Sequence, residues 1–361
     1  MRAVVLLGGA GTRLRPLTRT TPKQLLPIVE VPMIERVLAH LAAHGVSEAV
    51  LSLGYLHDSF VRLMPEGRMA GVSLAWAVEP EPLDTAGAVA FAARTAGIDD
   101  SPFLVVNGDV LTDLDIGAMI AFHTDRSGEA TISLAEVADP SAFGLVDVDG
   151  AGRVTRFIEK PAFRLPGAGR VNAGTYVLEP AVLDRIPSGG RMSIEREVFP
   201  GMVDKKLLFG FFSSEYWTDT GTPGQYLQAQ LDLLSGARPG PPAPGATSRG
   251  NSVWTLGDPV LDGEVRGPAL VGSAAFVARG AVVEGSVIGS GARVHSGARV
   301  QESVLLPGAA VRAGAVVSRS MVGERAVVGE NARLSDLTVV GAGTEIVPGC
   351  RLEGARVPAD D

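Results

Sequence analysis

Glycines and cations directly follow the first apolar stretch of the chain. Residues 6–15 read LLGGAGTRLR, and Lys23 follows ten residues after Arg13. Glycine lets a backbone approach a ligand closely, and loop N–H groups together with arginine and lysine side chains bind phosphate oxygens. The spacing fits neither the dinucleotide fingerprint G-x-G-x-x-G nor the P-loop G-x-x-x-x-G-K-[ST]. By itself the stretch predicts either another kind of phosphate-binding loop or a glycine-rich turn with solvated arginines.

The elements that must position this loop alternate along residues 1–235. Apolar runs predict strands, and helical periodicity with glycine stops predicts helices. This order indicates an α/β fold with a Rossmann-like, mainly parallel sheet covered by helices. Ligands bind at the carboxyl ends of such strands, where GGAGTR and Asn107-Gly108-Asp109 both fall. The expected strands are 3–8, 48–55, 72–79, 102–109, 129–137 and 153–161, and the expected helices are 33–45 and 84–97, the second with an aspartate cap.

A different pattern begins after a Pro/Gly-rich linker at residues 236–250. Over residues 251–361, branched aliphatic residues recur every six positions, in triplets that start 17 or 18 residues apart. This hexapeptide repeat predicts a parallel β-helix, whose flat faces favour assembly into a homo-oligomer. The expected inward residues are Val271, Val277, Val283, Ile288, Val294, Val300, Leu305, Val311, Val317, Val322, Val328, Leu334, Val340, Ile346 and Leu352.

The composition excludes several classes of partner. The formal net charge is −8, which argues against nucleic acid or an anionic membrane surface. No apolar run approaches the roughly 20 residues that span a bilayer, and the N-terminus lacks the features of a signal peptide. The single cysteine, Cys350, allows no internal disulfide, so we expect a cytoplasmic protein. A small anionic ligand stays compatible with this charge, because a local pocket can be basic in an acidic protein.

Residues 8–28, GGAGTRLRPLTRTTPKQLLPI, closely resemble the signature G-G-x-G-T-R-L-x-P-L-T-x-x-x-P-K-x-x-x-P of the sugar-1-phosphate nucleotidyltransferases. VVNGDVL, FIEKP, VNAGTYVL and YWTDTGTP resemble later segments of the same family, so the resemblance covers the whole chain. A C-terminal left-handed β-helix and the segment SIEREVFP at residues 193–200 are similar to its mannose-1-phosphate guanylyltransferase branch.

The resemblance implies nucleotidyl transfer. The phosphate oxygen of a sugar 1-phosphate attacks the α-phosphorus of a nucleoside triphosphate, and pyrophosphate leaves. Because this nucleophile is already an anion, catalysis consists of positioning and charge neutralisation.

The resemblance also implies roles for individual residues. Arg13, Lys23 and Asp109 would be catalytic, and Asp109 with Asp219 would hold Mg²⁺, which hard oxygen ligands suit. The implied nucleotide-binding residues are Leu7, Gly8, Gly9, Gly11, Thr12, Arg13, Lys23, Glu79, Asp84, Gly87 and Gly108, and those for the sugar phosphate are Gly144, Glu159, Lys160 and Asn172. The alternatives are turn aspartates at Asp109 and Asp219, and a surface ion pair between Glu159 and Lys160.

One departure from the family bears on the base. Residues 81–87 read EPLDTAG where the family usually has EPLGTAG, so Asp84 replaces a glycine. Asp84 can cap the following helix; alternatively, it or Glu79 accepts hydrogen bonds from N1–H and N2–H₂ of guanine. The second interpretation favours GTP, and the resemblance favours mannose 1-phosphate.

Several alternatives for the activity stay open. One is transfer from dTTP or UTP to glucose 1-phosphate, and another is guanylyl transfer to a cyclitol phosphate. A third is a non-catalytic regulatory homologue that binds nucleotide sugar. A fourth is a hexapeptide acyltransferase, which only His295 supports.

Overall fold

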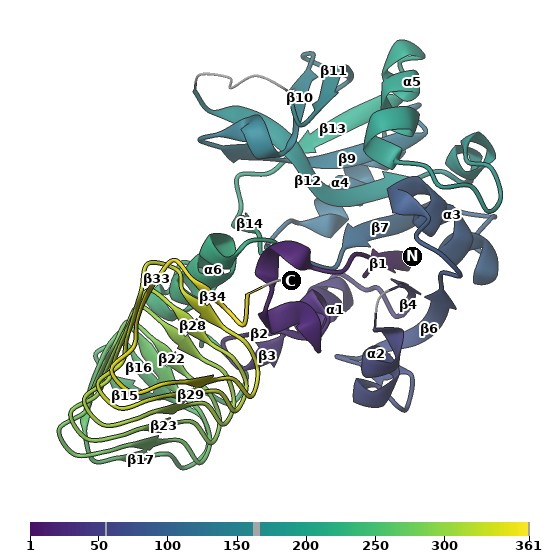
Figure 1. Cartoon of the computed structure of the whole chain (residues 1–361). Coiled ribbons are helices and arrows are strands. Elements are labelled where there is room, and N and C mark those ends of the chain that lie inside the picture. The colour runs from purple at the N-terminus through teal and green to yellow at the C-terminus, as the bar shows by residue number, and fades with distance from the viewer. Residues whose placement is uncertain (55, 162–166, 360–361) are drawn as a thin grey trace. The chain divides into compact units, whose positions relative to one another are not determined.

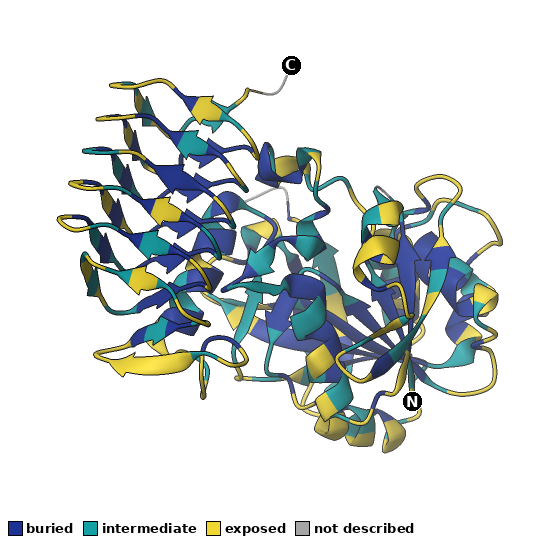
Figure 2. Ribbon diagram, turned by 90° about the horizontal axis from the view of Figure 1, so that it is seen from below, coloured by how far each residue is buried: buried dark blue, intermediate teal, exposed yellow. Residues whose placement is uncertain are grey.

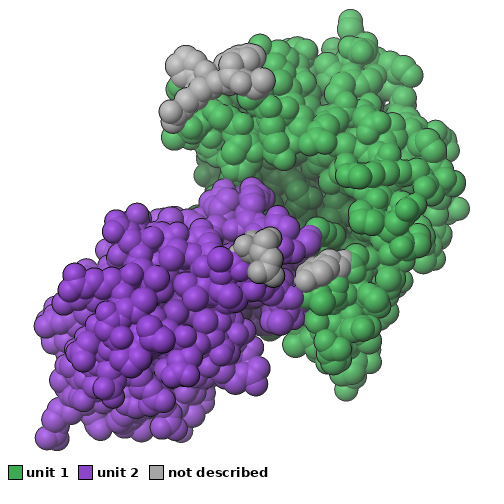
Figure 3. All heavy atoms as spheres, viewed as in Figure 1, with its two compact units in different colours: residues 1–9, 34–217 green, residues 10–33, 218–361 purple. Residues whose placement is uncertain are grey.

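The computed structural model describes residues 1–54, 56–161 and 167–359. Their contacts divide into two compact units, shown in Figure 3. Unit 1 consists of residues 1–9 and 34–217, and unit 2 consists of residues 10–33 and 218–361. The chain therefore leaves unit 1 inside the glycine-rich loop and leaves it again directly after Trp217.

Unit 1 is built on one ten-stranded sheet (Figure 1). Its centre, β7-β1-β4-β6, is parallel, and β12 joins it by antiparallel pairing with β7. The full order is β11-β10-β12-β7-β1-β4-β6-β5, with β9 between β12 and β13. The strands are β1 Arg2–Leu6, β4 Glu48–Leu53, β5 Arg68–Met69, β6 Val72–Val78, β7 Phe103–Asn107, β9 Ala130–Val137, β10 Gly144–Val148, β11 Val154–Glu159, β12 Gly169–Leu178 and β13 Leu208–Phe212.

Helices cover this sheet and complete its core (Figure 2). Ala3, Val4 and Val5 of β1 are fully buried, as expected of a central parallel strand covered on both faces. The alanine-rich helix α3 and the aromatic side chain of Phe199 pack into the same core. The helices are α1 Met33–Ala43, α2 His57–Leu63, α3 Asp84–Thr95, α4 Ile116–Thr124, a π-helix at Ile194–Val198 and α5 Phe199–Asp204.

The predicted α/β fold is confirmed, and each predicted strand and helix of this part of the chain is present. The last residue of the predicted strand 48–55, Tyr55, lies outside the described residues. Shorter elements connect the main ones: the strands β8 Val110–Thr112 and β14 Trp217–Asp219, and 3₁₀ turns at Thr12–Leu14, Leu17–Arg19, Lys23–Leu25, Pro140–Ala142 and Pro180–Arg185. No helix in the described part of the chain combines the length and apolar character needed to cross a bilayer.

Unit 2 contains the predicted left-handed parallel β-helix. From β19 onward, successive strands of each of its three sheets lie 17 or 18 residues apart, as in the pairs Val271↔Ile288 and Ile288↔Leu305. The predicted inward residues form its core, with Leu352 at the edge, and a second set of small residues, such as Ala275 and Ala292, fills the corners.

The strands of the β-helix fall into three sheets. The first holds β15 Thr247–Gly250, β16 Val253–Thr255, β19 Ala269–Val271, β22 Val287–Ile288, β25 Val304–Leu305, β28 Met321–Val322, β31 Val339–Val340 and β34 Arg356–Val357. The second holds β17 Val260–Leu261, β20 Phe276–Val277, β23 Arg293–Val294, β26 Ala310–Val311, β29 Val327–Val328 and β32 Glu345–Ile346. The third holds β18 Glu264–Arg266, β21 Val282–Glu284, β24 Arg299–Gln301, β27 Val316–Ser318, β30 Arg333–Ser335 and β33 Arg351–Glu353.

The same unit holds a short hairpin and one helix. The hairpin pairs β2 Pro27–Ile28 with β3 Val31–Pro32, and the helix is α6 Pro223–Ser235. The Tyr226 hydroxyl and the Gln230 side-chain amide of α6 both donate to the carbonyl oxygen of Pro27, at 2.6 and 2.8 Å. These bonds fasten residues 27–32 to α6.

Candidate nucleotidyl-transfer site

The start of the signature lies in unit 1, at the carboxyl end of β1. Leu7 is buried, and its N–H donates to the carbonyl oxygen of Ser52. The N–H of Gly108 donates to the carbonyl oxygen of Leu6, so the Asn107-Gly108-Asp109 turn lies beside the end of β1. Both segments follow parallel neighbouring strands, where the sheet exposes backbone groups to ligands.

The rest of the signature lies in unit 2 and is tightly packed. Gly11 has a φ of 59°, a conformation that favours glycine. A β-carbon there would lie 3.1 Å from Cγ2 of Thr18 and 3.3 Å from Cβ of Lys23. The Thr18 hydroxyl donates to the carbonyl oxygen of Gly11 at 2.7 Å. The loop that carries Thr12 and Lys23 is thus folded back on itself.

Arg13 and Asp219 meet in unit 2 at Gly221. A β-carbon on Gly221 would lie 2.6 Å from Nη2 of Arg13 and 2.7 Å from Oδ1 of Asp219. The N–H of Gly221 donates to Oδ1 of Asp219, which fixes the orientation of that carboxylate. Oδ1 of Asp219 therefore accepts the hydrogen bond expected of a turn aspartate. The same carboxylate also lies beside Arg13, another candidate catalytic residue. Gly221 lies within YWTDTGTP, and nothing in the sequence alone assigns it a role.

The candidate base-binding residues lie in unit 1 around the start of α3. Glu79 holds this loop, because it accepts from the Ser52 hydroxyl at 2.9 Å and from the Leu83 N–H at 3.1 Å. A β-carbon on Gly8 would lie 3.7 Å from the same carboxylate. Glu79 thus accepts one hydrogen bond at each oxygen from groups of the chain, and Asp84 at the start of α3 is the second carboxylate in this region.

Asp84 adopts a left-handed backbone with a φ of 59°, which explains why the family usually has glycine there. The predicted aspartate cap is wrong, because the N-cap position belongs to Leu83, which makes no side-chain cap, and Asp84 is the first residue of α3. The Asp84 carboxylate nevertheless supports the first turn, since Oδ1 accepts from the Thr85 N–H at 2.9 Å. Gly87 lies one turn further on, buried, where a β-carbon would come within 2.6 Å of the Gly190 carbonyl oxygen.

The candidate sugar-phosphate residues converge on the β10–β11 and β12 edge of the same sheet. Gly144 pairs with Glu159 across β10 and β11, and a β-carbon on Gly144 would lie 2.9 Å from a Glu159 carboxylate oxygen. The Asn172 amide donates to the Tyr176 hydroxyl at 3.0 Å and accepts from the Gly174 N–H at 3.2 Å.

Glu159 and Lys160 do form an ion pair, at 3.3 Å, but they differ in exposure. The Glu159 side chain is 16% exposed and the Lys160 side chain 61%. The lysine can therefore swing to a ligand, while the carboxylate is fixed in a half-buried site. Burial, chiefly, raises the pKa of Glu159; the charge of Glu195 adds to this shift, and Lys160 opposes it.

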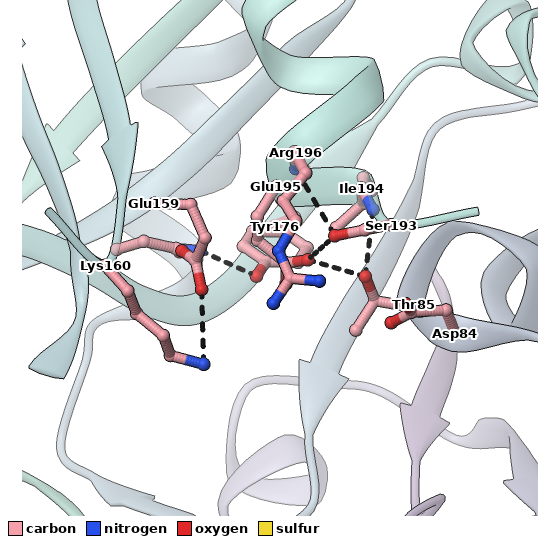
Figure 4. A network of polar contacts seen from close by, with 10 residues as sticks. Asp84, Thr85, Glu159, Lys160, Tyr176, Ser193, Ile194, Glu195 and Arg196 are labelled. Carbon is pink, nitrogen blue, oxygen red and sulfur yellow. Dashed lines mark hydrogen bonds and ion pairs between the residues drawn. The ribbon is translucent and has the colours of Figure 1, made fainter. Parts of the chain in front are cut away.

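Glu195 and Thr85 join this site, and the sequence analysis assigned neither (Figure 4). Glu195 lies on the π-helix, a rare element that often marks functional positions. Its Oε2 accepts from the Thr85 hydroxyl at 2.6 Å and from the Ser193 hydroxyl at 2.9 Å. The Thr85 hydroxyl in turn accepts from the Ile194 N–H. A threonine next to the candidate base residue Asp84 thus fixes the segment SIEREVFP beside Glu159.

The residues proposed for the metal carry suitable ligand atoms. Mg²⁺ is bound in proteins through one or two carboxylates, with substrate phosphates and water completing its shell. Asp109 follows β7, and Asp219 ends β14 with its orientation fixed by Gly221. Among the residues the structure describes there is no group of three or more histidine, cysteine or acidic side chains that could hold a metal alone. Each of these carboxylates is by its chemistry a suitable ligand for a metal that also binds phosphates and water.

Comparisons with known proteins identify the family. The Nucleotidyl transferase family matches residues 2–236, and the GMPPB C-terminal domain matches residues 265–360. A mannose-1-phosphate guanylyltransferase of Mycobacterium tuberculosis is 38% identical over 285 residues, 78% of this chain and 76% of that protein. A mannose-1-phosphate guanyltransferase of Schizosaccharomyces pombe is 40% identical over 241 residues, 66% of each chain.

Solved structures agree with this assignment. HddC from Yersinia pseudotuberculosis complexed with GMP-PN has a TM-score of 0.55 and 29% identity, covering 64% of this chain and 99% of that one. The chain belongs to the nucleotidyl transferase family, carries a C-terminal domain of the GMPPB type, and is a nucleotidyltransferase.

Proposed function

We propose that this enzyme transfers the guanylyl group of GTP to mannose 1-phosphate, forming GDP-mannose and pyrophosphate. The observation that carries the proposal is the name shared by relatives 38–40% identical to this chain, all mannose-1-phosphate guanylyltransferases. The chain also carries Arg13, Lys23, Asp109 and Asp219, the residues for which the family signature implies catalytic and metal-binding roles. Their presence opposes a regulatory homologue without catalysis.

The chemistry follows from the charges. A phosphate oxygen of mannose 1-phosphate forms a bond to the α-phosphorus of GTP, and the bond from that phosphorus to the bridging oxygen of the leaving pyrophosphate breaks. Arg13 and Lys23 neutralise the triphosphate, and Lys160 binds the sugar phosphate. Loop N–H groups at Gly9, Gly11 and Thr12 bind further phosphate oxygens. No proton has to be removed from the nucleophile.

Mg²⁺ is the metal that we propose for Asp109 and Asp219. When bound, it would neutralise phosphate charge and favour departure of pyrophosphate. The residues of the chain orient the two substrates against each other, and this positioning acts together with electrostatic stabilisation of the transferred phosphoryl group.

Two carboxylates give the proposed specificity. Asp84 would accept from N1–H and N2–H₂ of guanine, whereas thymine and uracil offer a single donor at that edge. Glu159, with Glu195 beside it, would accept from hydroxyl groups of the sugar. Assembly into a homo-oligomer through the β-helix is a further proposal, which sedimentation of the purified chain would test.

The direct test is product analysis. The purified chain with GTP, mannose 1-phosphate and Mg²⁺ is expected to yield GDP-mannose and pyrophosphate in equal amounts, and chelation of the metal is expected to stop both. Turnover only with a cyclitol phosphate, or only with dTTP or UTP and glucose 1-phosphate, would overturn the substrate assignment and keep the reaction class.

The raised pKa of Glu159 predicts a pH dependence. The pKa of an ordinary glutamate is about 4.3. Because the pKa of Glu159 is raised, its carboxyl group becomes protonated at a higher pH than that of an ordinary glutamate. We therefore expect the KM for mannose 1-phosphate to rise as the pH falls through that raised pKa, with little change in the KM for GTP. Glu159→Gln is expected to give a high KM at every pH, measured by initial rates.

The same shift has the opposite consequence for stability. Because the folded state binds the Glu159 proton more tightly than the unfolded state, this group costs stability as the pH rises between the two pKa values. Glu159→Gln should consequently unfold at neutral pH at no lower temperature than the parent. Glu48→Gln, at an exposed position of β4, is the matched control. It should change neither the KM for mannose 1-phosphate nor the unfolding temperature. An unchanged KM in Glu159→Gln would remove Glu159 from the sugar site.

A further inference from the structure

We use the name nucleotide loop for residues 10–33, and a carboxylate of this loop contacts the β-helix. Glu30 lies at the tip of the β2–β3 hairpin, where both Val29 and Glu30 have left-handed backbones with φ of 47° and 65°. Oε2 of Glu30 accepts from the N–H of Ser290 at 2.9 Å and from the Ser290 hydroxyl. Hydrogen bonds to an ionised acceptor are stronger than those between neutral groups.

The β-helix leaves room for this carboxylate. A β-carbon on Gly272 would lie 2.9 Å from Oε2 of Glu30 and 2.6 Å from the N–H nitrogen of Ser290. Gly272 follows β19, and Ser290 comes two residues after β22, its neighbour in the next coil. Glu30 is therefore seated at a corner shared by two consecutive coils.

Other contacts hold the same stretch of chain at both ends. Beside Glu30, the Val29 N–H donates to the Gln230 side chain at 2.6 Å. Towards the signature, the Arg19 guanidinium donates to the carbonyl oxygen of Ala359. Pro16 touches the last coils, because a β-carbon on Gly341 would lie 3.1 Å from its Cβ. Residues 10–33 thus belong to the compact unit that contains the β-helix.

We propose that Glu30 is a positioning residue for the nucleotide loop and that the β-helix, through Ser290, holds Arg13 and Lys23 in place for the triphosphate. Glu30 lies seven residues after Lys23, and the 3₁₀ turn Lys23–Leu25 leads almost directly into β2. A hairpin fixed at its tip limits how far Lys23 can move. The inference rests on the proposed function in one respect, namely that Arg13 and Lys23 bind GTP.

Kinetics give the first test. Glu30→Ala is expected to raise the KM for GTP about tenfold, the cost of one lost charge-assisted contact, and to change the KM for mannose 1-phosphate less than twofold. Ser290→Ala should shift the KM for GTP in the same direction. Because the two residues act through one contact, the double variant should be no worse than Glu30→Ala. Glu30→Gln, which keeps an acceptor for the Ser290 N–H, should recover part of the affinity.

The control is Ser296→Ala, a serine at an exposed turn of the same β-helix. It should leave both KM values and the unfolding temperature unchanged. Additive effects of Glu30→Ala and Ser290→Ala, or equal rises in both KM values, would overturn the inference.

Hydrogen exchange gives a second test that needs no turnover. In the full chain without ligands, the amides of residues 10–33 should exchange faster in Glu30→Ala and in Ser290→Ala than in the parent, while those of β1 and β7 stay unchanged. Unaltered exchange in residues 10–33 would overturn the inference, even if guanylyl transfer is confirmed. If the parent fails to use GTP but the exchange still changes, the proposed function fails and the anchoring stands. Should Glu30→Ala fail to fold, Ser290→Ala and Glu30→Gln carry the same comparison.

Discussion

Arg13→Ala is expected to lower kcat for nucleotidyl transfer by about 10²–10³, with little change in the unfolding temperature. The reason is that Arg13 would stabilise charge that builds up on the α-phosphate and on the departing pyrophosphate, and removing one such preorganised donor typically has an effect of this size. Single-turnover measurements at saturating GTP and sugar phosphate would isolate this step.

Arg13→Lys separates charge from geometry. The variant keeps the positive charge and loses the planar fork that binds two phosphate oxygens at once, so its kcat should lie between those of the parent and of Arg13→Ala. Arg62→Ala, an exposed arginine on α2 that bonds Ser59, is the matched control and should behave as the parent. A kcat within twofold of the parent in Arg13→Ala would remove Arg13 from the proposed mechanism.

Gly221→Ala is expected to lower kcat by about a hundredfold, since displacing a catalytic group by about 1 Å can have that consequence. The added methyl group would lie 2.6 Å from Nη2 of Arg13 and 2.7 Å from Oδ1 of Asp219, so both side chains must move. The guanidinium is the flexible end of a long side chain, and the fold should tolerate the change. The expected result is a folded protein with weakened metal-dependent turnover.

Gly224→Ala is the control for Gly221→Ala, because it adds the same methyl group three residues further on. There a β-carbon makes only an ordinary contact, 3.6 Å from Leu337, and alanine is the better helix former in α6. Kinetics of the two variants should therefore differ sharply. Equal activity in both would mean that the Arg13–Asp219 neighbourhood plays no part in turnover.

Periodicity explains why so much of the fold could be predicted. The β-helix follows from its hexapeptide spacing, because a strict repeat places an aliphatic residue inside at every sixth position, as Val271, Val277 and Val283 show. The central strands follow from runs such as AVVLL, which only a sheet covered on both faces can bury. The linker and the domain boundaries at residues 235 and 250 stay predictions, since the compact units follow contacts rather than chain order.

The parts that sequence reasoning missed depend on long-range contacts. Glu195 of the sugar region accepts a hydrogen bond from Thr85, which lies 110 positions away in the sequence. The hydrogen bond between Glu30 and Ser290 likewise joins residues that are 260 positions apart. No local pattern encodes such pairs, although SIEREVFP, which contains Glu195, resembles a segment of the family. The left-handed backbone of Asp84 could have been predicted from the sequence, because the family usually has glycine at that position and glycine favours this conformation.

The central claim is guanylyl transfer to mannose 1-phosphate, and direct competition tests it most sharply. The chain would be given GTP, dTTP and UTP together with equal amounts of mannose 1-phosphate and glucose 1-phosphate in the presence of Mg²⁺, and the nucleotide sugars formed would be separated and weighed by mass spectrometry. The account predicts GDP-mannose as the main product, with pyrophosphate released in equal amount. A predominance of dTDP-glucose or UDP-glucose would contradict it.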